Sequence, residues 1–261
     1  MSTRIFAIAQ SASVAGDLRA NIERHVRFGE VAAMQGAHFL IFPELSLTGY
    51  ELDLAASSAV AIDSAELEPL SQLAREGPMT VVASLPLRES NGEISLSAVT
   101  FRPSGGKLIY SKQNLHGREK QIFAPGIGGP DYAITGVTIG LAICADIANP
   151  QHAADAAQRG VMVYATSVFV SEPGYAEDSS RLSGYAAQHS MAVLMVNHAG
   201  ETGGVRSAGR SAIWAAGGEL VAQCPDNSEA LLFGKRISNG SWEAWQAPVS
   251  LPMPASSKVT F

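Results

Sequence analysis

This chain of 261 residues has little cysteine, no long apolar run and few charges, and each shortage excludes a class of protein. Its two cysteines, Cys144 and Cys224, are too few for a disulfide framework. No apolar stretch approaches the roughly 18 residues that a membrane-spanning helix needs, and the N-terminal residues lack the apolar segment of a signal peptide. We therefore expect a cytoplasmic protein whose cysteines serve reactivity rather than cross-linking.

Basic clusters are also missing from the sequence. The 18 Lys and Arg residues are outnumbered by 24 Asp and Glu, which gives a formal net charge of −6, and no run of basic residues occurs. Nucleic acids and anionic membrane surfaces are bound through concentrated positive charge, so we expect neither as a partner. Apolar residues are abundant, at 46% against 16% charged, which indicates a globular fold with a large core.

Short apolar segments and helical patterns alternate along the chain. Segments of strand length cover 4–9, 37–42, 79–85, 96–101, 137–143, 161–165 and 192–197. Helical patterns cover 17–35, 64–76, 151–159 and 179–190. Pairs such as 79–85 with 93–101 and 208–214 with 219–222 are typical of hairpins. The alternation predicts an α/β fold, and the hairpins predict that its sheet is mixed rather than wholly parallel.

Three reactive side chains stand where predicted strands end. Glu44 follows the segment 37–42 through a proline, Lys112 follows a short apolar segment, and Cys144 follows the segment 137–143 directly. Side chains just past the carboxyl ends of strands line the binding crevice of open α/β sheets. The three residues are therefore candidates for one site, although they lie far apart along the chain.

Together these residues would make a coherent catalytic set. A thiol becomes a useful nucleophile when a base takes its proton and a positive charge lies nearby. Glu44 can accept the proton of Cys144, and Lys112 supplies the compensating charge. At a separation of ~4 Å and an effective dielectric of ~20, one charge pair is worth about 4 kcal/mol, or roughly 3 pK units. We therefore expect Glu44 and Cys144 to titrate as a coupled pair.

Each of these residues also has a structural interpretation. A free cysteine is usually buried core, a lone Glu after a strand usually caps a turn or helix, and a lone Lys is usually a solvated charge. A second enzymatic hypothesis is a Cys–His hydrolase in which His189 or His198 is the base. The six histidines include no His-x-x-x-His pair, so we predict no metal site.

Five motifs, in order along the chain, carry a family resemblance. They are residues 42–50 (FPELSLTGY), 110–115 (YSKQNL), Glu119 with 123–126 (FAPG), 140–146 (GLAICAD), and Asn197 with Gly200 and 209–211 (GRS). The first motif is specific by itself, and the ordered set is more so. Over about residues 4–235 the sequence resembles the nitrilase (carbon–nitrogen hydrolase) superfamily, on its amidase-like side.

The resemblance implies a fold and a role for each motif residue. The fold is an α-β-β-α sandwich, with two mixed β-sheets face to face and helices on the outside. Cys144 would be the nucleophile and Glu44 the general base, while Lys112 and the backbone N–H of Ala145 would hold the oxyanion. Glu119 would position substrate or water, unless it is a surface helix charge. No metal or other cofactor is implied, because the nucleophile and the oxyanion donors are all protein groups.

The sequence departs from the family after the nucleophile. Where the family commonly has Cys-Tyr-Asp-x-Arg-Phe-Pro-Glu, residues 144–151 are CADIANPQ. Ala148 replaces the arginine that helps to hold anionic substrates, which argues against N-carbamoyl amino acids. It argues less firmly against dicarboxylic monoamides, since Arg206 and Arg210 are other candidate sources of positive charge. True nitrilases carry Trp-Glu after the nucleophile, so Ala145-Asp146 is more typical of amidases.

The resulting prediction is cysteine-dependent hydrolysis of a small aliphatic or ω-amide to carboxylic acid and ammonia, through a thioester. The alternatives are an N-carbamoyl amine amidohydrolase, a nitrilase, or a catalytically degraded protein that binds a metabolite or partner. The resemblance also implies a homodimer or higher homo-oligomer. We expect one hydrolase domain over 1–245 and a C-terminal tail or dimer arm over 246–261, because the last stretch contains Pro and Ser and lacks periodicity.

Overall fold

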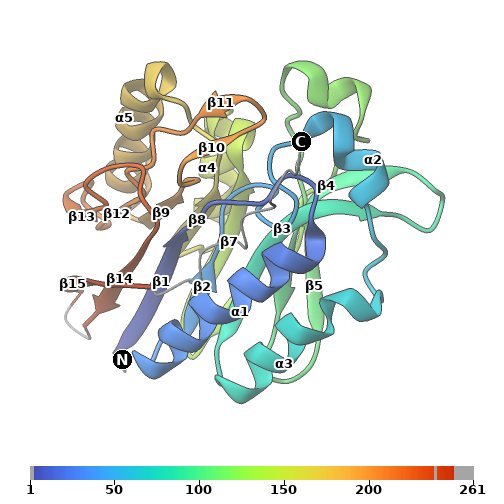
Figure 1. The fold of residues 1–261 in the computed structure, drawn as a ribbon. Coiled ribbons are helices and arrows are strands. Elements are labelled where there is room, and N and C mark those ends of the chain that lie inside the picture. The colour runs from blue at the N-terminus through green and yellow to red at the C-terminus, as the bar shows by residue number, and fades with distance from the viewer. Residues whose placement is uncertain (1–2, 238–239, 250–261) are drawn as a thin grey trace, which may run out of the picture.

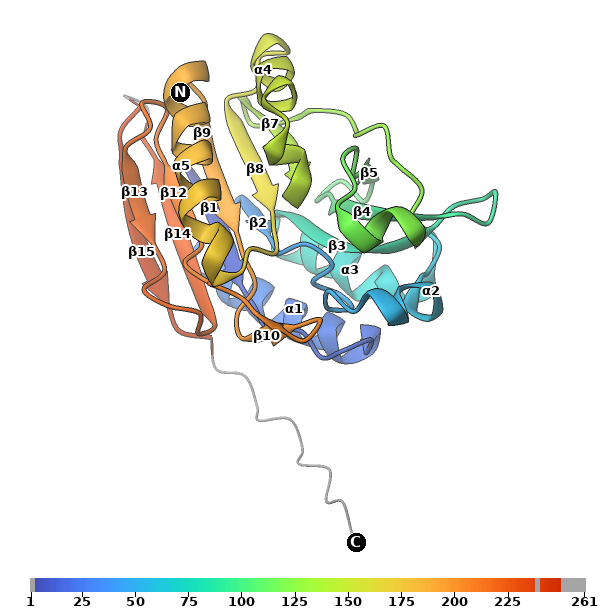
Figure 2. The same ribbon diagram turned by 90° about the horizontal axis from the view of Figure 1, so that it is seen from above.

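The computed structural model describes residues 3–237 and 240–249, which form two β-sheets between layers of helices (Figures 1 and 2). The first sheet contains β1 (Arg4–Gln10), β2 (Phe39–Ile41), β3 (Thr80–Arg88), β4 (Ile94–Phe101), β5 (Lys107–Ser111), β14 (Ala230–Arg236) and β15 (Trp242–Ala247). The second contains β6 (Tyr132–Ile134), β7 (Val137–Ile143), β8 (Val163–Ser167), β9 (Ala192–Val196), β12 (Ala212–Trp214) and β13 (Leu220–Gln223). A separate hairpin joins β10 (Glu201–Thr202) and β11 (Val205–Arg206).

Both sheets mix parallel and antiparallel pairing. The strand order is β15-β14-β1-β2-β3-β4-β5 in the first sheet and β13-β12-β9-β8-β7-β6 in the second. At the centre of the first sheet β1, β2 and β3 run parallel, and β7, β8 and β9 do so in the second. The β3–β4 hairpin and the β12–β13 hairpin are antiparallel, as the sequence predicts. Parallel strands at the centre bring their carboxyl ends to one edge of each sheet.

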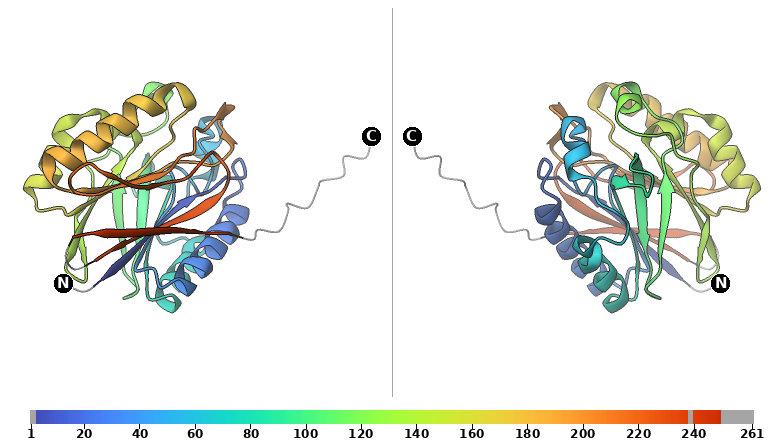
Figure 3. Two further views of the ribbon diagram at one scale, coloured as in Figure 1. Left: turned by 90° about the vertical axis from the view of Figure 1, so that its left-hand side faces the viewer. Right: turned by 90° about the vertical axis from the view of Figure 1, so that its right-hand side faces the viewer.

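Helices cover the outer face of each sheet (Figure 3). The helices are α1 (Leu18–Met34), α2 (Ala55–Ser58), α3 (Glu68–Glu76), α4 (Pro150–Gln158) and α5 (Glu172–His189). Apolar residues of α1 and α3 pack on the first sheet, and those of α4 and α5 pack on the second. The result is the α-β-β-α sandwich that the resemblance implies.

The side-chain alternation along β1 explains the layering. Phe6 and Ile8 face the second sheet and pack in the central core, whereas Ala7 and Ala9 face the helices. Successive side chains of a strand point to opposite faces, so a strand with apolar residues on both faces is buried between two layers. That is why the central strands form nearly continuous apolar segments in the sequence.

The structure differs from the sequence prediction at several boundaries, among them the start of α5, and in its C-terminal strands. Helix α5 begins at Glu172, seven residues before the expected start at 179, because Pro173 occupies a first-turn position where a proline is tolerated. The strands β14 and β15 were not predicted, and Gln246 and Ala247, which we placed in the tail, pair in β15 with β14. Residues 250–261 of that tail lie outside the described residues. Within the described ranges, no helix is long and apolar enough to cross a membrane.

Candidate active site

Three strand ends carry the predicted catalytic residues, and the fold brings them together from both sheets. Glu44 lies three residues beyond β2, and Lys112 directly follows β5, both in the first sheet. Cys144 directly follows β7 of the facing sheet and opens the 3₁₀ turn η4 (Cys144–Ala148). The site therefore lies where carboxyl ends of strands from the two sheets meet.

Lys112 is at the centre of a buried charge cluster. Its Nζ donates to Glu44 Oε1 at 2.6 Å and to Glu119 Oε1 at 2.8 Å. All three side chains are at most 1% exposed. A buried ammonium is stable when carboxylates take up its hydrogen bonds, so this geometry holds the charge of Lys112 in place. The structural interpretations of Lys112 as a solvated charge and of Glu119 as a surface charge are therefore wrong.

Glu119 is fixed by three partners. Besides Lys112, the Tyr50 hydroxyl donates to Oε1 at 2.6 Å, and the backbone N–H of His116 donates to Oε2 at 2.8 Å. The residue lies in the 3₁₀ turn η3 (Gly117–Gln121), and its bond to His116 closes that turn. Both of its oxygens therefore accept hydrogen bonds from the protein, and the carboxylate is held against Lys112.

Cys144 has an unusual backbone. Its φ is +42°, in the left-handed region that residues with a side chain rarely adopt. Such strain concentrates at functional sites, where the surrounding structure enforces it. The thiol is half-buried and donates to the Phe169 carbonyl oxygen at 3.7 Å. The next residue in the turn is Ala145, whose N–H belongs to the first turn, where backbone donors lack helical partners.

Burial and the charges of the cluster together shift the pKa values of its members. Burial raises the pKa of Glu44 to about 7, although Lys112 opposes the shift, and Glu119 adds to it. Burial and the Glu44 charge raise the pKa of Cys144 well above its ordinary value. Burial alone would lower the pKa of Lys112, but Glu44 and the other acidic neighbours outweigh it and raise that pKa. The resting site thus pairs a neutral thiol with a carboxyl group poised to accept its proton near neutral pH.

Aromatic side chains lie beside Cys144. The rings of Tyr50 and Phe169 are 5.0 Å apart, and Phe169 is also the residue whose carbonyl accepts from Cys144. The β10–β11 hairpin contacts the backbone of Tyr50, because Thr202 Oγ1 accepts a hydrogen bond from the Tyr50 N–H at 2.7 Å. Gly203 has a φ of +58°, and a Cβ there would lie 2.5 Å from the Tyr50 carbonyl oxygen, so the close approach requires glycine.

Hydrogen bonds join the two sheets behind Glu44. The Ser167 hydroxyl, at the end of β8, donates to the Phe42 carbonyl at 2.7 Å. His198 Nε2 lies 2.6 Å from the Glu44 carbonyl oxygen. Burial lowers the pKa of His198 to about 4, so the ring is neutral and Nε2 carries the hydrogen that it donates. His198 therefore helps to fix the backbone of Glu44, and no hydrogen bond joins His198 or His189 to Cys144 among the described residues.

Asp146 ties the nucleophile turn to the lysine segment. Its Oδ1 accepts from the backbone N–H groups of Gln113 and Asn114 at 3.1 and 2.8 Å. Its Oδ2 accepts from the Ile143 N–H at 3.0 Å and from the Tyr110 hydroxyl at 2.7 Å. One buried carboxylate thus fixes the positions of both Cys144 and Lys112 relative to each other.

Sequence reasoning predicted that Glu44, Lys112 and Cys144 share one site but not which residues support them. Tyr50 and Asp146 belong to the sequence motifs without an assigned role, and no motif includes Phe169. The two arginines considered for substrate binding are engaged elsewhere: Arg210 pairs with Glu172 at 2.6 Å and Arg206 contacts Asn227. Among the described residues, no group of His, Cys, Asp and Glu is arranged to hold a metal ion.

The two facing sheets with helices outside define a protein of the α-β-β-α class, and comparison with known proteins gives the family. The sequence model of the Carbon-nitrogen hydrolase family matches residues 5–246. The chain belongs to this family. The relatives of this chain include an amidase and a nitrilase.

Two curated relatives illustrate the level of similarity. The chain is 28% identical over 210 residues to an (R)-stereoselective amidase of Pseudomonas sp, covering 79% of this chain and 76% of the relative. It is 28% identical over 204 residues to a nitrilase of Pyrococcus abyssi, covering 76% of each chain.

Solved structures share the fold. A mutant of the amidase from Nesterenkonia sp. AN1, in complex with butyramide, matches with a TM-score of 0.80 at 24% identity, over 88% of this chain and 89% of that one. Saccharomyces cerevisiae Nit3, a member of branch 10 of the nitrilase superfamily, matches with a TM-score of 0.85 at 19% identity, over 92% of each chain.

Proposed function

We propose that this carbon–nitrogen hydrolase cleaves small, uncharged aliphatic amides to a carboxylic acid and ammonia. The observation that carries the proposal is the Glu44–Lys112–Glu119 cluster on one sheet opposite Cys144 on the other. This arrangement supports a site in which Glu44 is the base, Lys112 an oxyanion donor and Cys144 the nucleophile. The 28% sequence identity to an (R)-stereoselective amidase supports the same reaction class.

The first half of the reaction forms a thioester. Glu44 accepts the proton of Cys144 while the sulfur attacks the amide carbonyl carbon, and the carbonyl oxygen becomes an oxyanion. Lys112 Nζ and the Ala145 N–H stabilise this oxyanion from fixed positions, so little reorganisation is needed. Collapse of the tetrahedral intermediate breaks the C–N bond, and Glu44 returns its proton to the leaving nitrogen, which departs as ammonia.

The second half releases the acid. Glu44 takes a proton from a water molecule, whose oxygen attacks the thioester carbon. The C–S bond breaks, Cys144 regains its proton from Glu44, and the carboxylic acid leaves. Glu119 acts throughout by holding Lys112, which in turn keeps the carboxyl group of Glu44 in register with the thiol.

The charge of the site supports an uncharged substrate. Two carboxylates and one ammonium surround the reacting atoms, and Ala148 supplies no cation where the family has arginine. A substrate carboxylate placed in this buried surrounding would lose its hydration without gaining a partner. Simple aliphatic amides avoid that cost, whereas ω-amides with a free carboxylate and N-carbamoyl amino acids incur it.

Ammonia release from matched compounds tests the proposal. The panel contains butyramide, its nitrile, the monoamide of succinic acid and an N-carbamoyl amine, with Cys144→Ala as the blank. We expect Cys144-dependent release from butyramide at a kcat/KM at least ~10-fold above that of the monoamide, because an unpaired buried charge costs over 1.4 kcal/mol. Faster release from the charged monoamide would overturn the substrate class. Stoichiometric labelling of Cys144 by iodoacetamide, together with no ammonia release from any compound of the panel, would favour a catalytically degraded protein that binds a metabolite or partner.

A further inference from the structure

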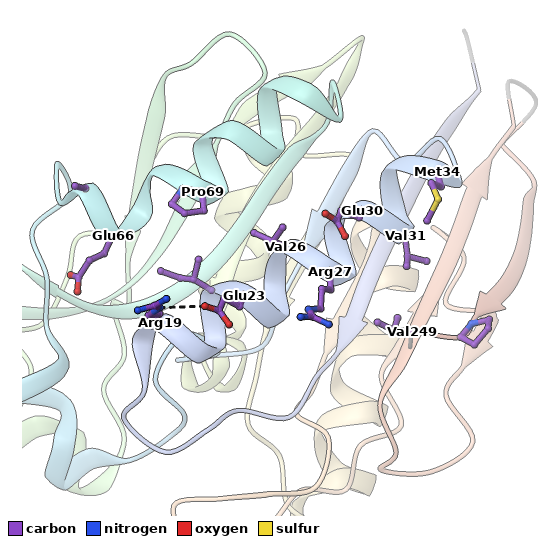
Figure 4. A pocket seen from close by; sticks show the side chains of 13 residues that line it. Arg19, Glu23, Val26, Arg27, Glu30, Val31, Met34, Glu66, Pro69 and Val249 are labelled. Atoms are coloured by element: carbon purple, nitrogen blue, oxygen red, sulfur yellow. Dashed lines mark hydrogen bonds and ion pairs between the residues drawn. The ribbon is translucent and has the colours of Figure 1, made fainter. Parts of the chain in front are cut away.

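A long groove lies on the outer helical layer, away from the catalytic residues. Its volume is about 930 Å³, and α1 forms one wall along nearly its whole length (Figure 4). The lining residues of α1 recur every three or four positions, as a stripe along one face: Arg19, Ile22, Glu23, Val26, Arg27, Glu30, Val31 and Met34. The start of α3 and the residues before it form the opposite wall, through Ala65, Glu66 and Pro69.

The groove exposes apolar surface on a helix whose other face already packs on the sheet. Phe28 and Ala32 of α1 are fully buried against the first sheet, whereas Met34 is 76% exposed and Val26 and Val31 are half-buried. An amphipathic helix on a protein surface normally presents polar residues outward. An apolar groove with polar edges on such a helix is typical of a docking site.

The chain itself enters this groove. After β15, Pro248 and Val249 line it, and Val249 lies beside α1 in Figure 4. Val249 is also the last described residue, and residues 250–261 follow it in the sequence. We propose that residues 250–261 dock in the α1–α3 groove of their own chain.

The length and composition of the segment fit the groove. Twelve residues in an extended or polyproline conformation span about 37 Å at ~3.1 Å per residue, whereas α1 is about 25 Å long at ~1.5 Å per residue. Two prolines, Pro252 and Pro254, favour that extended form and reduce the entropy lost on docking. The segment carries four large apolar side chains: Leu251, Met253, Val259 and Phe261.

Charge and tethering favour the same occupant. The groove is lined by three glutamates and two arginines, and Arg19 already pairs with Glu23. Lys258 is the single ionisable side chain of the segment, so it complements the excess negative charge. Because Val249 lies in the groove, the effective concentration of the segment there is on the order of millimolar, and weak contacts suffice.

Disulfide trapping in the full-length chain tests the docking. In a Cys144→Ala background, which removes the reactive thiol, Glu23→Cys is combined with Met253→Cys and oxidised in a glutathione buffer. Cys224 remains, because it is fully buried. Position 253 lies at most about 14 Å along the chain from Val249, so a docked segment brings it to the α1 wall. We expect an intramolecular disulfide, seen as a monomer of altered mobility on a non-reducing gel.

A matched pair provides the control. Gln188 is exposed on α5, on the far side of both sheets, so it is several layer spacings of about 10 Å from the groove. The pair Gln188→Cys with Met253→Cys should form an intramolecular disulfide at least ~10-fold more slowly. Adding Leu251→Asp should slow the Glu23–Met253 cross-link, whereas Ser256→Asp, which adds the same charge at a polar position, should not.

Two outcomes would overturn the proposal. Equal rates for the two pairs would mean that the segment does not prefer the groove. A disulfide formed between chains, when the Glu23→Cys and Met253→Cys proteins are mixed, would mean that the segment is a dimer arm and occupies the groove of a second copy. Loss of folding in the double variants is recognised by their circular dichroism, and Arg27→Cys then replaces Glu23→Cys as the exposed partner on the same wall.

Discussion

Tyr50 donates its phenolic hydrogen to Glu119 Oε1 at 2.6 Å, and the same oxygen accepts from Lys112 Nζ at 2.8 Å. One carboxylate oxygen thus connects an aromatic wall of the site to its central cation. Lys112 also donates to Glu44. The Tyr50 hydroxyl is therefore connected to Glu44 through Glu119 and Lys112. This connection gives Tyr50 a role that its position in a motif does not reveal.

Removal of the Tyr50 hydroxyl should therefore lower turnover more than binding. For Tyr50→Phe we expect kcat to fall about 10- to 100-fold, since a hydrogen bond to a charged group is worth roughly 1.5–3 kcal/mol. KM should change little, because the aromatic wall stays. Tyr132→Phe is the matched control, since Tyr132 lies in β6 and its hydroxyl contacts Thr100. A Tyr50→Phe enzyme with unchanged kcat would show that Glu119 needs no support from the phenol.

The pH dependence of kcat/KM should report Glu44. Burial raises its pKa from 4.5 to about 7, so below that pH the carboxyl group already holds a proton and cannot accept one from Cys144. Activity should rise as the pH increases through about 7. The pKa of Lys112 is raised, so its charge should not be lost on the alkaline side near neutrality. A profile measured from about pH 5 to about pH 9 that is flat would contradict this assignment of the base.

Replacing Lys112 should damage both activity and stability. Lys112→Met keeps much of the side-chain volume but leaves Glu44 and Glu119 buried without their cation, which costs about 3–5 kcal/mol of unfolding free energy. The rate should fall at least ~10²-fold with the oxyanion donor gone. The triple variant Lys112→Met, Glu44→Gln, Glu119→Gln should recover much of the stability and none of the activity. Urea denaturation of both proteins checks this, and equal instability would argue against unpaired charge as the cause.

Asp146→Asn should loosen the nucleophile turn. The amide would present a donor where the carboxylate now accepts from the Ile143 N–H, and one unsatisfied buried donor costs about 1–3 kcal/mol. We expect a lower melting temperature together with a lower kcat, because Cys144 and Lys112 both depend on this carboxylate. Asp155→Asn, on the exposed side of α4, serves as a control of equal chemistry. Full activity in Asp146→Asn would mean that the strained backbone of Cys144 is enforced by other contacts.

Much of this candidate site can be predicted from the sequence because its polar residues follow the ends of apolar strands. Cys144 and Lys112 directly follow apolar segments, which predicts that they lie at strand ends. The motif around Glu44 adds the family resemblance. The mixed-sheet α/β class followed from the same alternation. The layers of the sandwich came from the resemblance, because apolar periodicity alone does not tell which strands pair across two sheets.

The supporting contacts were not readable, for physical reasons. His198 donates to a backbone carbonyl 154 residues away, and a contact with the main chain leaves no trace in the pattern of side chains. Glu119 looks like a surface charge in sequence, and its burial depends on the positions of Tyr50 and Lys112 in space. The expected homodimer and cytoplasmic location stay predictions.

The most direct test of the account is the mass of the peptide that carries Cys144, after acid quench during turnover of an amide that releases ammonia. We predict that this peptide gains the acyl group of that amide as a thioester, and that Cys144→Ala shows neither the adduct nor ammonia release. Turnover that continues in Cys144→Ala, or an acyl group found on another residue, would contradict the central claim that Cys144 is the nucleophile.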